Sequence, residues 1–410
     1  MATDSRHDVV IVGGRVAGAS LATHLALAGL DVAVVERASF PSDTLSTHVV
    51  YPNSIARLER LGVLDEILAH GPPPLYTAWH HAGAMFVAPH TPIEGRDWAL
   101  CVRRITLDKI LVDRARSAGA KVIERFTMTG LLGAGTDDDP VGGICGRHEG
   151  GERILRAPIV IGADGVHSTV ARRLGAERQL IMPTPTMMLY AYWKDLPLRN
   201  CQEFFFDPPW IGTHFPADEG HHLVILIGPV EEYSARAKES IYLDRVAAIR
   251  PLAVRLREGL RVSKVFGTSQ LDGYYRRAAG PGWALAGDSG HFKHPAAVQG
   301  IADALEATEV LASTIPDGSY STRFPGWRDH ATREMYAFSR FAGAVPSPEG
   351  IGEIVSAAAM DADLARAIVD IWSRAQAPWD VIPRVPAMLQ AAGESPDEVL
   401  APLEAVPAAA

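Results

Sequence analysis

The chain has 410 residues, of which 47% are hydrophobic and 21% are charged, and its formal net charge is −9. This composition is typical of a globular protein long enough for two domains. The negative charge argues against nucleic acid as a partner, because binding a phosphate backbone requires clustered Lys and Arg. The apolar runs are too short for a membrane span, and the spacing of Cys101, Cys145 and Cys201 suits neither a disulfide framework nor a metal site. We therefore expect a cytoplasmic protein, and the sequence leaves its oligomeric state open.

The N-terminal segment has the layout of a dinucleotide-binding βαβ unit. Residues 8–12 form an apolar run, residues 13–18 a glycine-rich turn, and residues 19–28 an apolar helical stripe. A second apolar run, residues 32–35, then leads to Glu36. In such a unit the pyrophosphate binds at the helix N-terminus, and the acid accepts hydrogen bonds from a ribose. A glycine-rich turn without a ligand is the alternative interpretation.

Arg15 stands where the G-x-G-x-x-G pattern has its middle glycine. A side chain is tolerated there only if it points away from the pyrophosphate or pairs with it through charge-assisted hydrogen bonds. Further along, a helix predicted to start at Arg104 leaves that arginine at its N-terminal edge, free to meet phosphate or solvent. A strand at residues 159–161 precedes an acidic turn at Asp164, and Ser168 is a predicted helix cap.

A third segment predicts a buried strand at residues 283–286, an acidic turn at Asp288 and a helix that opens at Gly300. An acid at the carboxyl end of a strand suits a chain of hydroxyl groups. A glycine at a helix N-terminus lets backbone N–H groups approach an anion. A reduced flavin offers both partners, its ribitol chain and its negative charge.

Taken in order, these motifs resemble those of the FAD-dependent aromatic hydroxylases, the p-hydroxybenzoate hydroxylase-like class A monooxygenases, over about residues 8–312. The resemblance implies an α/β fold: a Rossmann-like FAD-binding domain, an inserted mixed β-sheet substrate domain and a C-terminal helical region. It places Glu36 on the adenosine ribose, Arg104 near the pyrophosphate and Asp288 on the ribitol. Backbone N–H groups of Gly300 and Ile301 would meet the isoalloxazine O2. The implied FAD-binding residues are Gly13, Gly14, Arg15, Ala17, Gly18, Glu36, Arg37, Arg104, Met128, Asp164, Gly165, Asp288, Pro295, Gly300 and Ile301.

Several positions depart from that family's pattern. The sequence Asp-Thr-Leu-Ser-Thr-His at residues 43–48 occupies a segment where an arginine is usual. His294 stands where a proline is common, Ala297 replaces a glycine of the P-x-x-G-x-G run, and Ala302 replaces a common asparagine. These features resemble a branch related to geranylgeranyl reductase-like flavoproteins. These departures leave the NAD(P)H site and the substrate undetermined, whereas FAD remains the expected cofactor.

The predicted domains alternate along the chain. The FAD-binding domain takes residues 1–72, 98–180 and 271–330, the substrate domain takes residues 73–97 and 181–270, and a helical region takes residues 331–410, of which 394–410 form a frayed tail.

The predicted sheet of the substrate domain is rich in aromatic side chains, which indicates an apolar or aromatic ligand or, for any one residue, ordinary core. These residues are Tyr190, Tyr192, Trp193, Phe204, Phe206, Trp210 and Phe215. The pairs His80–His81 and His221–His222 do not suggest a metal site, because neighbours on a strand point to opposite faces. We expect them to be solvated strand-end histidines.

The resemblance implies a reaction in which NADPH or NADH reduces FAD. Oxygen then adds at C4a, and the flavin hydroperoxide hydroxylates or epoxidises a hydrophobic, aromatic small molecule. His48, Lys293 and His294 are the candidates for polar groups near the ring, able to activate a phenol or orient the substrate. Lys293 could equally be a surface cation, and His48 a structural cap.

Other functions remain open at this point. One is an FAD-dependent reductase of unsaturated, prenyl-type substrates; another is a non-catalytic flavin- or drug-binding protein. A halogenase is a weaker variant, because residues 210–216 lack the second Trp of a Trp-x-Trp-x-Ile-Pro signature. The electrons could also come from a separate flavin reductase.

Overall fold

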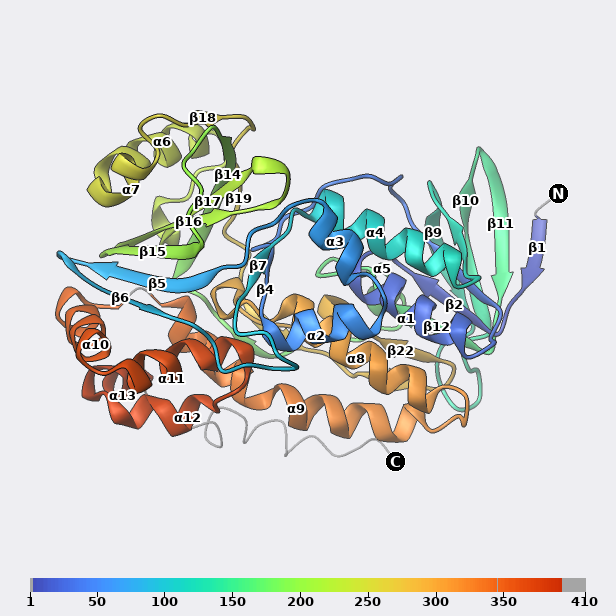
Figure 1. Ribbon diagram of the computed structural model, residues 1–410. Helices are drawn as coiled ribbons and strands as arrows, with labels where there is room; N and C mark the ends of the chain where they lie inside the picture. Colours follow the sequence, from blue (N-terminus) through green and yellow to red (C-terminus); the bar gives the residue numbers. More distant parts are fainter. Residues whose placement is uncertain (1–2, 345, 393–410) are drawn as a thin grey trace.

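The computed structural model describes residues 3–344 and 346–392 and shows a mixed α/β protein (Figure 1). The tail predicted at residues 394–410 lies outside the described residues. A six-stranded sheet has the order β21-β22-β12-β2-β3-β8, parallel except between β21 and β22. Its strands are β2 (Val9–Val12), β3 (Val32–Val35), β8 (Lys121–Ile123), β12 (Ile159–Gly162), β21 (Ala279–Gly280) and β22 (Trp283–Leu285).

The apolar runs predicted as strands form this sheet because both of its faces are covered, which removes the need for polar residues on either side. Val9 and Ile11 join the core shared with helices α1 (Val16–Leu27), α4 (Arg104–Ser117) and α8 (Gly300–Thr314). Val10 and Val12 face the opposite core. That core is completed by a four-stranded sheet, β1 (Thr3–Arg6), β11 (Gly151–Arg156), β10 (Gly143–His148) and β9 (Thr127–Leu132).

The predicted helix starts at Arg104 and Gly300 are confirmed, and α1 packs against both of those helices. The Ser168 cap is also confirmed. Its Oγ accepts a hydrogen bond from the Ala171 N–H, at 2.9 Å, at the start of α5 (Thr169–Arg173). The carboxyl ends of β2, β12 and β22 therefore lie beside helix N-termini, where ligands of open α/β sheets bind.

A second, eight-stranded sheet has the order β18-β14-β17-β16-β15-β5-β6, with β19 beside β14. Its strands are β5 (Tyr76–His81), β6 (Ala84–Ala88), β14 (Thr186–Lys194), β15 (Cys201–Asp207), β16 (Trp210–Pro216), β17 (His222–Pro229), β18 (Leu260–Arg261) and β19 (Phe266–Thr268). The sheet predicted around the aromatic residues between positions 190 and 215 is present, and these residues lie on β14, β15 and β16. Alternate residues of β14 face different cores: Leu189 faces helices α6 (Lys238–Ala248) and α7 (Arg250–Arg255), and Met188 the C-terminal helices.

Of the C-terminal helices, α10 to α13 form a separate layer below β5 and β6 in Figure 1, with α10 packed on both strands and α11 on β6, whereas α9 runs beneath α8. The C-terminal helices are α9 (Tyr320–Gly343), α10 (Pro348–Met360), α11 (Ala362–Ser373), α12 (Pro378–Val381) and α13 (Pro386–Ala392). Smaller elements connect the sheets: α2 (Pro52–Arg60), α3 (Leu64–Ala69), β4 (Val49–Val50), β7 (Leu100–Cys101), β13 (Gln179–Met182), β20 (Gly273–Tyr275) and β23 (His291–Phe292). Within the described part of the chain, no helix combines the length and apolarity needed to cross a bilayer.

The expectation of solvated strand-end histidines is wrong for His222. This side chain is buried under α6 and α7, where its ring stacks on His214 with centroids 5.0 Å apart. Its Nδ1 lies 2.9 Å from His214 Nε2. Burial lowers the pKa of His222 to about 4, so the ring is neutral near pH 7.

Candidate functional site

The glycine-rich turn after β2 is fixed by a close backbone approach. Gly13 has φ +106°, and a Cβ there would lie 2.3 Å from the carbonyl oxygen of Ala163, at the end of β12. A Cβ at Gly18 would lie 1.8 Å from the Gly13 carbonyl oxygen. Glycine is therefore required at both positions by sterics and, at Gly13, by conformation. The turn leaves the N-terminus of α1 open to a ligand.

Glu36 closes one end of this turn. Its Oε2 accepts a hydrogen bond from the Gly14 N–H at 2.8 Å, and its Oε1 accepts one from the Ala38 N–H at 2.9 Å. A carboxylate has about four acceptor positions, so each oxygen can accept another bond. This donor-acceptor balance fits the two hydroxyls of a ribose.

Arg15, which replaces the middle glycine, points toward α4 and toward Ser42 in the loop after β3. Its Nη1 lies 2.5 Å from Asp108 Oδ2, and its Nη2 donates to Ser42 Oγ at 3.1 Å. Arg104 donates to the same carboxylate, with Nε 3.0 Å from Asp108 Oδ1. Two guanidinium groups thus share one buried carboxylate, which leaves an excess positive charge. That charge suits a pyrophosphate at the N-terminus of α1.

At the opposite end, Asp288 follows β22 and faces the start of α8. A Cβ on Gly300 would lie 3.7 Å from Asp288 Oδ1. The carboxylate accepts no hydrogen bond from the residues that the structure describes, and burial raises its pKa to about 6. An acceptor without partners beside an open helix N-terminus fits a ribitol chain followed by an anionic ring edge.

A cavity of about 530 Å³ connects the two ends, and we call it the flavin cavity. It brings together residues from many separate parts of the chain. Gly14 and Gly18 are the only FAD-binding candidates outside its wall. The candidates that line it are Gly13, Arg15, Ala17, Glu36, Arg37, Arg104, Met128, Asp164, Gly165, Asp288, Pro295, Gly300 and Ile301.

Asp164 lies in the wall but is already occupied by the protein. Its carboxylate accepts hydrogen bonds from Ser168 Oγ and from the N–H groups of Thr169 and Val170. Burial nonetheless raises its pKa above the ordinary value. Asp164 therefore fixes the start of α5 beside the flavin cavity. Gly165, with φ +75°, forms the turn between Asp164 and α5.

Lys293 is the only one of the three catalytic candidates that lines the flavin cavity. It is buried rather than a surface cation, and it forms an ion pair with Asp303 on α8. Burial lowers the pKa of Lys293 to about 8, although Asp303 opposes the shift. The ammonium can therefore give up its proton only slightly above neutral pH.

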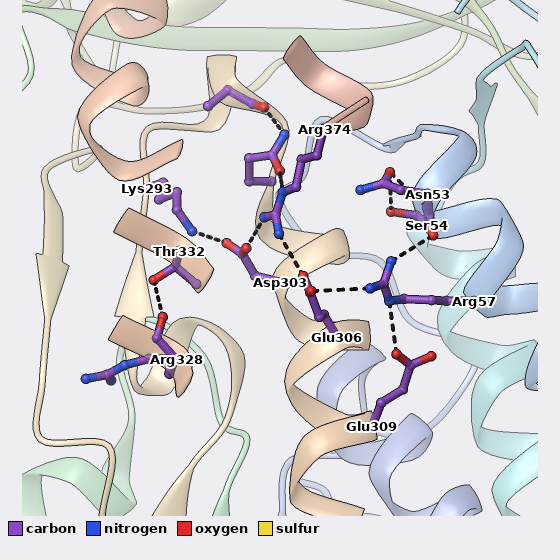
Figure 2. A network of polar contacts seen from close by, with 12 residues as sticks. Asn53, Ser54, Arg57, Lys293, Asp303, Glu306, Glu309, Arg328, Thr332 and Arg374 are labelled. Carbon is purple, nitrogen blue, oxygen red and sulfur yellow. Dashed lines mark hydrogen bonds and ion pairs between the residues drawn. The ribbon is translucent and has the colours of Figure 1, made fainter. Parts of the chain in front are cut away.

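Asp303 has two further partners: His291, whose Nε2 lies 3.3 Å from Asp303 Oδ2, and Arg374 from the C-terminal layer (Figure 2). Arg374, just after α11, pairs with Asp303 and donates to Glu306 Oε2 at 2.7 Å. Burial alone would raise the pKa of Asp303, but the charges of Lys293 and Arg374 hold it well below the usual range. Arg57 on α2 extends the network to Glu306 and Glu309.

His48 and His294 line neither the flavin cavity nor the second cavity that adjoins it. The His48 Nε2 lies 2.7 Å from the hydroxyl of Tyr192, and burial lowers its pKa to about 3. The His294 Nε2 lies 3.0 Å from Thr186 Oγ1, its Nδ1 accepts from the Ala296 N–H, and burial lowers its pKa to about 4. Both rings are neutral near pH 7, and both are buried in polar contacts with neighbouring side chains.

A second cavity of about 390 Å³ adjoins the first, and we call it the apolar cavity. Phe204, Phe206 and Phe215 line it, as do Trp79 and, from α11, Trp372. Trp193 and Trp210 instead belong to the core under α6 and α7. Among the residues that the structure describes, none that lines the apolar cavity is charged. Its polar members are Thr47, Thr213, Ser347, Gln390 and Trp79 and Trp372 through their indole nitrogens.

The C-terminal half of this wall was not predicted from the sequence. Ile351 and Ile354 of α10 and Ala387 of α13 complete the apolar cavity. These are ordinary apolar residues of amphipathic helices, and their sequence pattern signals burial without saying against what. The aromatic residues of β15 and β16 were the only signal for this cavity.

The glycine of the P-x-x-G-x-G run falls on Val298 when it is counted from Pro295, not on Ala297. The structure shows why a glycine is common there: Val298 has φ +53° and ψ 37°, in the left-handed region. For a β-branched residue this conformation is a strained outlier that costs roughly 1–3 kcal/mol. Val298 lies in the walls of both cavities.

The FAD binding domain family model matches residues 6–317. The chain is 26% identical over 346 residues to the digeranylgeranylglycerophospholipid reductase of Methanocella arvoryzae, a match that covers 80% of this chain and 83% of that protein. It is 27% identical over 179 residues to an uncharacterized aromatic compound monooxygenase of Bacillus subtilis, covering 42% of this chain and 34% of that protein. A flavoprotein/dehydrogenase structure from Cytophaga hutchinsonii shares the fold, with a TM-score of 0.79 at 19% identity, and the match covers 98% of this chain and 100% of that one. Because the family model spans well over half of its length, the chain belongs to the FAD binding domain family and is an FAD-dependent oxidoreductase.

Proposed function

We propose that this protein is an FAD-dependent monooxygenase that uses NADPH or NADH and O2 to hydroxylate or epoxidise a neutral, hydrophobic small molecule. One observation carries the proposal: an apolar cavity of about 390 Å³ shares part of its wall with the flavin cavity. The shared residues are Thr47, Met188, Ile225, Pro295 and Val298. A substrate in the apolar cavity would therefore lie next to the ring end of a bound flavin.

The residues of the flavin cavity have defined tasks in this proposal. Glu36 binds the adenosine ribose, Arg15 and Arg104 face the pyrophosphate, and Asp288 binds the ribitol. Reduced FAD would activate O2 for transfer of one oxygen atom to the substrate. The N-terminus of α8 stabilises negative charge at the ring edge. Lys293 can hold or release a proton beside it, since its pKa lies at about 8.

The apolar cavity supports a neutral substrate rather than an acid. A carboxylate or phosphate would be buried there without a cation, which is strongly unfavourable. The rings of Trp79 and Phe206 lie 4.9 Å apart, and Trp372 meets Trp79 edge-on at 5.8 Å, so the wall offers aromatic faces. Dry walls also limit the wasteful release of peroxide during turnover.

An oxygen electrode tests this proposal with purified, FAD-loaded protein, NADH or NADPH, and a panel of neutral aromatic compounds. We expect oxygen uptake and nicotinamide oxidation that rise together with the right compound. Ile354→Trp should fill the apolar cavity and abolish the stimulation, while FAD remains bound. The absence of oxygen uptake with either nicotinamide, and with a flavin reductase added, would remove the proposal.

A second function has a specific observation in its favour. The similarity to a digeranylgeranylglycerophospholipid reductase extends over 80% of the chain, much further than the similarity to the monooxygenase. The apolar cavity could equally hold an unsaturated prenyl chain. Saturation of a prenyl double bond by the dithionite-reduced protein without oxygen would favour this reductase.

A further inference from the structure

The wall shared by the flavin cavity and the apolar cavity, which we call the partition, contains one residue with an unusual backbone conformation. Five residues contribute to both walls: Thr47, Met188, Ile225, Pro295 and Val298. Of these five, Val298 alone has a left-handed backbone, with φ +53°. A side chain branched at Cβ crowds the backbone in that conformation, so glycine would be the residue of least strain. A valine at this point keeps a side chain in the partition at a conformational cost.

The C-terminal layer holds this segment in place from both sides. On one side, the indole Nε1 of Trp372 donates to the Ala296 carbonyl at 3.0 Å. On the other side, Gln299 donates to the Trp372 carbonyl at 3.1 Å and accepts from Arg374 Nε at 2.7 Å. The Val298 N–H itself donates to the Pro295 carbonyl at 2.9 Å. The valine is thus fixed by contacts that would persist if its side chain were removed.

We propose that Val298 is a specificity-determining residue, whose side chain separates the two cavities and sets how closely a substrate approaches the flavin. This inference rests on the proposed function, in which the flavin and the substrate occupy neighbouring cavities. Without the two methyl groups, the cavities would open into one another. With them, the partition admits molecules that present a narrow edge to the flavin, such as the rim of a flat ring system. Bulky substituents at the reacting end would be excluded.

A neutral fluorescent aromatic compound, N-phenyl-1-naphthylamine, can test the partition in the full-length, FAD-loaded protein. Quenching of tryptophan emission reports its binding, because Trp79 and Trp372 line the apolar cavity. A change in the visible absorption band of the flavin reports contact with the ring. The variants are Val298→Ala and Val298→Gly, and Ile354→Ala is the control on the α10 side of the apolar cavity.

We expect the compound to bind the wild type and the Ile354→Ala variant with little change in the flavin band. In Val298→Ala and Val298→Gly, binding should shift that band. Val298→Gly should also unfold at a higher temperature than Val298→Ala, because both lack the partition but only glycine relaxes the left-handed backbone. If Val298→Gly unfolded at a lower temperature than Val298→Ala, the left-handed backbone at this position would not be strained.

The inference is overturned if the compound binds both Val298 variants without changing the flavin band, or if Ile354→Ala shows the same band shift. A wild type that does not bind the compound would overturn it as well. The proposed reaction has its own test, since oxygen uptake does not depend on this compound. A band shift confined to the Val298 variants, together with no oxygen uptake, would support the role of Val298 in the partition and rule out the proposed monooxygenase reaction.

Discussion

Arg15 and Asp108 form an ion pair that joins the glycine-rich turn to helix α4, with Arg15 Nη1 2.5 Å from Asp108 Oδ2. The Asp108 side chain is fully buried, whereas that of Arg15 is 25% exposed. Arg15 also donates to Ser42. Arg15, the residue that breaks the glycine pattern, therefore links the glycine-rich turn, α4 and the loop after β3 at the pyrophosphate end of the flavin cavity.

Asp108→Asn should destabilise the protein, because it leaves Arg15 and Arg104 without their shared carboxylate. Breaking a buried pair costs roughly 3 kcal/mol or more. Urea unfolding of the FAD-free protein measures this loss. Asp113→Asn on the same helix is the control: the Asp113 side chain, which pairs with Lys109 and Arg116, is 38% exposed, and a loss of about 1 kcal/mol or less is expected. Equal losses in the two variants would show that the Arg15–Asp108 pair adds nothing special.

Asp288→Asn should make the FAD-free protein more stable at neutral pH, although it weakens FAD binding. Burial raises the Asp288 pKa from 3.8 to about 6, so the folded state binds the proton more tightly than the unfolded state. The wild type therefore loses stability as pH rises from about 4 to about 6, by up to roughly 3 kcal/mol. The variant lacks this loss, and its advantage should vanish below about pH 4.

Thermal unfolding from pH 4 to pH 8 checks this expectation, together with FAD titrations at pH 7. Asp244→Asn, at an exposed position of α6, is the control and should leave the pH profile unchanged. Parallel profiles for the wild type and Asp288→Asn would contradict the raised pKa. If Asp288→Asn kept full affinity for FAD, the ribitol would not bind at this carboxylate.

The sequence predicted four strands of the six-stranded sheet, β2, β3, β12 and β22, and the helix starts beside them, because each of these follows a local rule. It did not predict β8 and β21. Buried parallel strands appear as apolar runs, and Gly13 marks the place where the turn after β2 closely approaches the Ala163 carbonyl. The FAD-binding candidates came from the resemblance to the aromatic hydroxylases, and all but Gly14 and Gly18 line the flavin cavity although their chain positions are far apart.

Side-chain direction and long-range contacts could not be predicted in the same way. His48 and His294 neighbour cavity residues in sequence, but their rings turn into packed interiors beside Tyr192 and Thr186. Arg374 carries no motif, and it reaches Asp303 only because α11 folds back onto the start of α8. The left-handed backbone at Val298 could not be predicted, because a β-branched residue disfavours that conformation.

Arg374→Met should destabilise the protein and disturb the start of α8. The change leaves Asp303 and Glu306 with one cation fewer, a loss of roughly 3 kcal/mol. Arg374→Lys should recover only part of it, since one ammonium cannot meet Gln299, Asp303 and Glu306 together. Chemical unfolding measures the loss, and visible circular dichroism of bound FAD reports the helix start.

The control for this pair of variants is Arg366→Met, at an exposed position of the same helix. A change within about 0.5 kcal/mol is expected there. If Arg374→Lys matched the wild type in both measurements, a single positive charge would suffice, and the fork of hydrogen bonds in Figure 2 would have no special role.

Gly13→Ala and Gly29→Ala separate backbone conformation from close approach, because both glycines have positive φ, +106° and +88°. A Cβ at Gly29 meets no atom within 4 Å, whereas one at Gly13 would lie 2.3 Å from the Ala163 carbonyl oxygen. Gly29→Ala should therefore cost about 1 kcal/mol and keep FAD. Gly13→Ala must also push apart the ends of β2 and β12, at a total of roughly 3 kcal/mol or more. Unfolding temperatures and the FAD content of purified protein check both. Equal losses in the two variants would mean that conformation alone, and not the contact with Ala163, sets the shape of the turn.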